Sequence, residues 1–118
     1  MSNFQRRIVQ DNHTSHSAQG TLTNASAAIL TAGDDEVLTI DSIFLTEYSG
    51  NARTVTLRHV DSGDVDDGTA NFMTDLALAS KETFHLEGPI VLADGAALKA
   101  LASDNTSVNY LISYRKEV

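Results

Sequence analysis

The chain has 118 residues, enough for one domain whose core needs no cross-links. It has no cysteine, which excludes disulfides and thiolate metal sites, and its formal net charge of −8 argues against binding to nucleic-acid phosphates. Aromatic residues make up only 6% and tryptophan is absent, which disfavours a sugar-binding platform of stacked rings. No apolar run reaches the length of a signal peptide or a membrane span, so we expect a protein that stays in the cytoplasm or is assembled there into a larger particle.

Residues 1–20 differ from the rest of the chain. After Met1, their large apolar residues are Phe4, Ile8 and Val9. Their basic pair is Arg6 and Arg7. Residues 11–20 are polar or small, and such a stretch buries too little apolar surface to order itself. The sequence predicts an extended N-terminal arm over residues 1–20, either disordered or docked on a partner through those five residues, and a β-sandwich domain over residues 21–118.

Residues 37–60 carry the clearest β signal. Two runs alternate at period two on either side of Ser49-Gly50-Asn51, and Gly-Asn tolerates the left-handed backbone of tight turns. The pattern predicts a β-hairpin. On its first strand, strict alternation places one set of side chains on one face and a second set on the other: Leu38, Ile40, Phe44 and Tyr48 against Val37, Ile43 and Leu45.

The other predicted strands are short and separated by turn residues. They cover residues 21–32, 69–80, 81–87, 90–92, 96–102 and 107–118. A helix competes for the alanine-rich and mixed segments 21–32, 69–80 and 96–102, and Gly88-Pro89 is expected to end the strand before it. Seven to nine short strands without βαβ alternation predict an all-β antiparallel sandwich, jelly-roll-like or immunoglobulin-like.

Four carboxylates lie close together after the second predicted strand, at Asp61, Asp64, Asp66 and Asp67. Carboxylate oxygens are the ligands that calcium prefers, but no glutamate follows at the EF-hand offset and the flanks are not helical. A solvated loop is the stronger interpretation, and these aspartates are only weak metal candidates.

The sequence contains no strong catalytic motif. It has neither a G-x-S-x-G nucleophile elbow nor a glycine loop that would cradle phosphates. Tyr48, Tyr110 and Tyr114 could line a ligand face, but tyrosine is also a common strand residue. We therefore expect no enzymatic activity and no cofactor.

Two stretches carry a family resemblance. They are ILTAGDDEVLTIDSIFLTEYSGNARTVTLRHVDSG at residues 29–63 and LEGPIVLADGAALKALASDNTSVNYLISYRKEV at residues 86–118. The pattern from residue 29 to the end, about three-quarters of the chain, resembles small bacteriophage virion proteins. The resemblance implies a jelly-roll or immunoglobulin-like sandwich that decorates a capsid or forms part of a tail. It implies no catalytic or binding residues.

The resemblance implies a capsid decoration (cement) subunit that binds and stabilises an assembled shell, and the acidic, cysteine-free composition is compatible with that role. The expected partners are the major capsid protein or another virion protein, and further copies of the chain, with a trimer favoured because trimers suit three-fold positions of a capsid. The expected location is the virion, assembled in the host cytoplasm, with no nucleic-acid or membrane partner. The alternatives are a tail or neck component and a carbohydrate- or receptor-binding module.

Overall fold

The computed structural model describes residues 13–117. Within that range the chain forms eight strands and one short 3-10 helix. Their bounds are β1 His13–Thr21, β2 Ala27–Thr31, β3 Val37–Glu47, β4 Arg53–Val60, η1 Gly68–Ala70, β5 Asn71–Leu78, β6 Thr83–Ala93, β7 Ala97–Ala102 and β8 Val108–Glu117. No helix in this part of the chain is long and apolar enough to cross a membrane.

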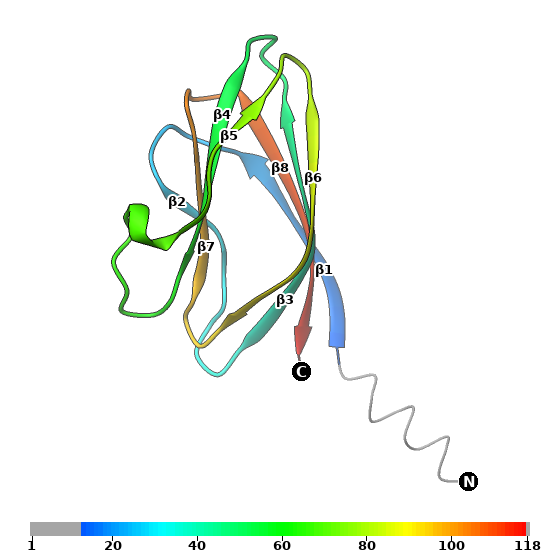
Figure 1. Cartoon of the computed structure of the whole chain (residues 1–118). Coiled ribbons are helices and arrows are strands. Elements are labelled where there is room, and N and C mark those ends of the chain that lie inside the picture. The colour runs from blue at the N-terminus through cyan, green and yellow to red at the C-terminus, as the bar shows by residue number, and fades with distance from the viewer. Residues whose placement is uncertain (1–12, 118) are drawn as a thin grey trace, which may run out of the picture.

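The strands form two four-stranded antiparallel sheets that face each other (Figure 1). Sheet A has the order β1-β8-β3-β6, and sheet B has the order β2-β7-β4-β5. The first strand therefore pairs with the eighth, the second with the seventh, the third with the sixth and the fourth with the fifth. This nested pairing is that of a jelly roll. The predicted all-β sandwich is confirmed, and of the two predicted topologies the chain adopts the jelly roll.

The predicted hairpin over residues 37–60 is wrong. β3 pairs with β6 and β8, whereas β4 pairs with β5 and β7 in the other sheet. The turn at Ser49-Gly50-Asn51 exists, with Gly50 at a φ of 93°, but it carries the chain from one sheet to the other. Turn chemistry reverses the chain direction locally, and it does not decide which strand becomes the hydrogen-bonded neighbour.

A bulge in β3 changes which side chains enter the core. The register with β8 shifts by one residue between Ile40 and Ser42, so Asp41 is extra. Leu38 and Ile40 before the bulge and Ile43 and Leu45 after it are all buried. An extra residue reverses the faces of everything that follows, so the strict alternation expected for this strand is wrong beyond Asp41.

β6 runs without interruption through Gly88-Pro89, where a strand break was expected. A Cβ atom on Gly88 would lie 2.0 Å from the carbonyl oxygen of Ile40, so only glycine fits beside the bulge of β3. Pro89 is tolerated because β6 is an edge strand, where a missing N–H can face away from the sheet.

Residues 13–20 were expected to be a tether outside the domain, and they instead form most of β1. Each residue from His13 to Thr21 pairs with a residue of β8, without a register shift. From Thr14 onward the side chains are mostly polar and exposed, and only Ala18 packs against the core, so the main-chain ladder with β8, more than apolar burial, orders this segment. The five predicted arm residues, Phe4, Arg6, Arg7, Ile8 and Val9, lie outside the described residues.

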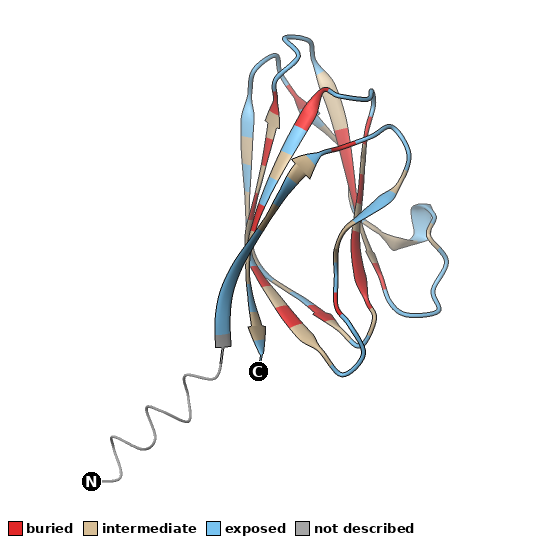
Figure 2. Cartoon of the chain, turned by 180° about the vertical axis from the view of Figure 1, so that it is seen from behind, coloured by how far each residue is buried: buried red, intermediate tan, exposed pale blue. Residues whose placement is uncertain are grey.

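The core lies between the two sheets, and Figure 2 shows that both sheets contribute buried residues along their strands. Sheet A contributes Ile43, Leu45 and Ile112, and sheet B contributes Leu57 and Leu98, all fully buried. On β8, Val108 and Ile112 are buried and Tyr110 and Tyr114 pack against the core, as the alternation of these four residues at period two predicts.

Candidate interaction surfaces

The four aspartates that were weak metal candidates do not converge on one point. Asp66 is held by cationic and hydroxyl groups instead: its Oδ1 accepts hydrogen bonds from Arg58 Nη1 and Ser26 Oγ, both at 2.9 Å, and its Oδ2 lies 3.2 Å from Lys99 Nζ. The Arg58 hydrogen bond lowers the pKa of the Asp66 carboxyl, and those from Ser26 and Lys99 act in the same direction against burial. The loop is thereby fastened over the outer face of sheet B.

The other three aspartates have separate roles or surroundings. Asp67 caps η1, because its Oδ1 accepts hydrogen bonds from the N–H and hydroxyl of Thr69, which lower the pKa of Asp67. Asp61 lies 3.5 Å from the Nδ1 atom of His59, and the N–H of Asp64 donates to the Asp61 carbonyl. Among residues 13–117, no three histidine, aspartate or glutamate side chains lie close enough together to hold a metal ion.

Calcium is expected to leave the melting temperature unchanged, because Asp66 already has cationic partners. A site held at roughly 100 times its dissociation constant would add about 2.7 kcal/mol of stability, and this would shift the melting temperature by several degrees. Thermal melts in calcium and in chelator make the comparison. A higher melting temperature in calcium than in chelator would contradict this expectation. If Asp66→Asn or Asp67→Asn abolished that increase, the cation site would lie in the loop.

A buried carboxylate organises the crossing from β3 to β4. The Glu47 side chain is fully buried, and its Oε2 accepts hydrogen bonds from the N–H and the hydroxyl of Ser49. Its Oε1 accepts from the N–H of Gly50 at 2.9 Å and of Lys81 at 3.2 Å. Burial raises the pKa of Glu47, but these hydrogen bonds outweigh it and lower the pKa to about 2. Sequence reasoning missed this residue; its one local signal is a glutamate that ends a strand two residues before Ser-Gly.

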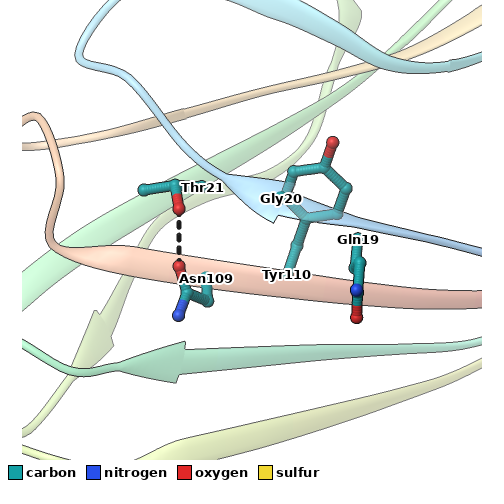
Figure 3. Close-up of a pocket in the computed structure, with 5 residues that line it drawn as sticks. All are labelled: Gln19, Gly20, Thr21, Asn109 and Tyr110. Atoms are coloured by element: carbon teal, nitrogen blue, oxygen red, sulfur yellow. Dashed lines mark hydrogen bonds between the residues drawn. The ribbon is translucent and has the colours of Figure 1, made fainter.

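A shallow hollow of about 410 Å³ lies where β1 ends beside β8 (Figure 3). It is lined by Gln19, Gly20, Thr21, Asn109 and Tyr110. A Cβ atom on Gly20 would lie 2.8 Å from the Tyr110 hydroxyl, so the missing side chain makes room for the ring. Thr21 Oγ1 donates to Asn109 Oδ1 at 2.7 Å. The lining offers amide and hydroxyl groups but no pair of nucleophile and base.

The three tyrosines considered as a ligand face have different surroundings. Tyr110 packs over Gly20, Tyr114 stacks on His16 with ring centroids 5.4 Å apart, and Tyr48 lies exposed after β3. Within the described part of the chain no two tyrosine rings stack on each other.

The outer face of sheet A is nearly uncharged at the end where β1 and β3 finish and β8 begins. The strand register places two rows of side chains across it: Thr21, Asn109, Thr46 and Thr83, then Gln19, Leu111, Phe44 and His85. Phe44 and His85 stack with centroids 4.4 Å apart, and Leu111 is 39% exposed. Neither row carries a carboxylate or a permanently cationic group, so this face differs from the acidic remainder of the molecule.

The described part of the chain has its basic side chains already engaged. Ion pairs join Arg53 to Asp104, Arg58 and Lys99 to Asp66, Arg115 to Asp41 and Lys116 to Glu36, and Lys81 donates to the Tyr48 carbonyl. Every acidic residue except Asp11 lies within residues 13–117, whereas two of the eight basic residues, Arg6 and Arg7, precede it. The sandwich therefore presents an excess of carboxylates to any partner.

No protein-family model matches the chain, and no curated protein matches it in sequence. Solved structures share its fold. A chain in the capsid structure of Helicobacter pylori bacteriophage KHP30 matches with a TM-score of 0.54 and 10% identity, covering 90% of this chain and 87% of that chain. A chain of the Bacillus endospore appendages, described as disulfide-linked pili, matches with a TM-score of 0.54 and 11% identity over the same shares.

A third match lies within a longer protein. The VP2 subviral particle of infectious bursal disease virus matches with a TM-score of 0.52 and 13% identity, covering 92% of this chain but 33% of that chain. At these identities the likeness shows a common fold. The resemblance to phage virion proteins is thus supported at the level of the jelly roll.

Proposed function

We propose that this chain is a structural subunit of a bacteriophage virion, and specifically a decoration (cement) subunit that binds and stabilises an assembled capsid. The observation that carries the proposal is the jelly roll shared over nearly the whole length of a similarly sized chain in a phage capsid structure. The chain acts mechanically as a homo-oligomer. A rigid sandwich bridges neighbouring capsid subunits, and each bridge raises the cost of separating them.

The arm is the proposed attachment to the shell. Residues 1–12 precede β1, whose first residue, His13, pairs with Glu117, so the arm starts at the end of the sandwich where β8 finishes (Figure 1). Arg6 lies seven Cα-to-Cα steps before His13, a reach of up to about 23 Å. Because the sandwich is acidic and Arg6-Arg7 is basic, the arm can bind a partner surface that the sandwich itself would repel.

Deleting residues 1–12 is expected to leave the melting temperature within a few degrees of the full chain and to abolish binding to shells. The fold should persist because the core and the β1–β8 ladder begin at residue 13. The measurement is co-sedimentation with capsid shells stripped of their small outer subunits, together with a thermal melt of the isolated protein.

The double variant Arg6→Ala/Arg7→Ala tests the basic pair, and Gln5→Ala/Gln10→Ala is its matched control within the arm. If the chain without residues 1–12 bound shells as strongly as the full chain, the arm would not be the attachment to the shell. A large fall in melting temperature on deletion would show that the arm belongs to the folded domain.

The runner-up roles are a tail or neck component and a glycan- or receptor-binding module, and we propose no enzymatic activity. Co-sedimentation with tails in place of shells would favour the first, and binding on a glycan array would favour the second. A subunit of a pilus shares the same fold, but this chain has no cysteine and cannot form the disulfide linkage described for the endospore appendages.

A further inference from the structure

The four edge strands of the two sheets are not equally protected against pairing with another chain. An edge strand exposes a row of N–H and C=O groups, and proteins block such edges with proline, bulges, charged side chains or short strands. The edges here are β1 and β6 in sheet A and β2 and β5 in sheet B.

Three of the edges carry such devices. β6 has Pro89 at its centre, beside the register shift opposite Asp41, and Glu87 two residues earlier. β2 is five residues long and contains a register shift after Ala28. β5 has two register shifts against β4, and Asp75 in its middle adopts a φ of 49°.

β1 carries none of them. Its sequence, HTSHSAQGT, has no proline and no acidic residue, lysine or arginine, and its nine residues pair with β8 without a shift. No main-chain group of β1 has a backbone partner outside that ladder among the described residues. Side chains from Thr14 to Ser17 are exposed. β1 is therefore a long and open edge without a bulge.

The charge of the molecule indicates which partner such an edge fits. Two copies with a net charge of −8 repel each other over most of their surfaces. Along β1 that repulsion is weakest, because the strand has no carboxylate and six of the nine β8 residues paired with it, at positions 109–114, are uncharged. The other three are Arg115, Lys116 and Glu117, two cations and one carboxylate. An identical strand is also self-complementary when it pairs antiparallel about a two-fold axis.

We infer that β1 is a self-association edge, at which the β1 strands of two copies pair antiparallel and join their A sheets into one eight-stranded sheet. Pairing centred on Ser17 uses all nine residues and places Ser17 opposite its own copy and Ser15 opposite Gln19 of the second copy. Such a ladder is about 30 Å long and contains about eight to ten main-chain hydrogen bonds, close to the number in a standard interface.

This contact joins copies in pairs, so it predicts a dimer of the isolated chain in place of the trimer expected from three-fold capsid positions. The inference does not depend on the capsid role. The chain can dimerise without binding shells, and its arm can bind shells whether or not two copies pair through β1, so the two proposals fail separately.

The test uses charge at Ser17, whose exposed side chain leaves room for substitution in the single subunit. A two-fold contact brings this position against itself, so Ser17→Glu and Ser17→Lys should each weaken association on the order of ten-fold by like-charge repulsion. An equal mixture of the two variants should restore it, since Glu then faces Lys. Thr83→Glu, exposed at the opposite edge of the same face, is the matched control.

Light scattering after size exclusion, across a range of concentrations, measures the mass of the full chain. The inference expects the mass to rise from 12.7 kDa to twice that value with concentration for the unmodified protein and for Thr83→Glu. For each Ser17 variant alone the rise should need roughly ten-fold more protein, and the mixture should regain the doubled mass at the lower concentrations. Hydrogen exchange of the β1 main-chain N–H groups should slow as concentration rises.

Three results would overturn the inference. They are a mass of 12.7 kDa for the unmodified chain at every concentration, a doubled mass that both Ser17 variants reach at the same concentrations as the unmodified chain, and a mixture that stays monomeric at those concentrations. Loss of the doubled mass on deletion of residues 1–12 but not in Ser17→Glu would assign the association to the arm. Thermal melts of both Ser17 variants confirm that they remain folded.

Discussion

Leu57→Asp is expected to abolish cooperative folding. Leu57 is fully buried in β4, an interior strand of sheet B, where its partner across the ladder is the buried Ala100. The substitution removes a core side chain, at a cost of about 2–5 kcal/mol, and leaves a carboxylate without a partner in apolar surroundings, which adds several kcal/mol more. The sum is comparable to the total stability of about 5–15 kcal/mol that a domain has.

Circular dichroism during thermal unfolding measures this effect. The matched control is Leu111→Asp, the same substitution on the outer face of sheet A, where the side chain is 39% exposed and the aspartate can remain hydrated. We expect that control to melt cooperatively within a few degrees of the unmodified protein. A cooperative melt of Leu57→Asp near that temperature would mean that the core is not where the structure places it.

Glu47→Gln is expected to cause the second-largest loss of stability among these variants. The carboxylate accepts four hydrogen bonds in a buried site, and an amide can accept at only one of its two polar atoms. The NH₂ group of the glutamine then points either at the main-chain N–H groups of Gly50 and Lys81 or at that of Ser49, and it cannot accept their hydrogen bonds. Leaving such groups unpaired should lower the melting temperature by about 5–15 °C.

The same residue makes stability depend on pH. The pKa of Glu47 is about 2 in the folded protein and 4.5 in the absence of these contacts, so folding favours its ionised form. Its stabilisation is therefore fully present above about pH 4.5 and is lost as the pH falls towards 2. The pKa values of Glu36, Asp66 and Asp67 are also lowered, so they add to the slope in the same direction.

Melting temperatures between neutral pH and pH 2 test this assignment. The unmodified protein should lose stability steeply below about pH 4.5, and Glu47→Gln should show a shallower slope. Glu87→Gln, which removes one carboxylate from an exposed position of β6, controls for the change in net charge. Equal slopes in Glu47→Gln and in the unmodified protein would show that Glu47 is not the group that titrates.

The sequence alone determined that the protein is all-β and where most strands lie. The strands at residues 97–102 and 108–117 fall within predicted segments, and the alternation of Val108, Tyr110, Ile112 and Tyr114 identified the core face of the last strand. Alternation and turn residues are read within a few neighbours along the chain, so they are available before any fold is known. The Asp61 to Asp67 stretch was likewise recognisable as a loop more than as a metal site.

The tertiary structure decided how the strands are paired. β1 is ordered by residues 109–117, far along the chain, so a polar segment that seemed unable to order itself became a strand. The bulge at Asp41 and the uninterrupted passage of β6 through Gly88-Pro89 depend on each other, because the space at Gly88 is set by the Ile40 carbonyl. Glu47 gains its partners only where the turn after β3 meets Lys81. These features arise from contacts between distant residues, which a local pattern does not contain.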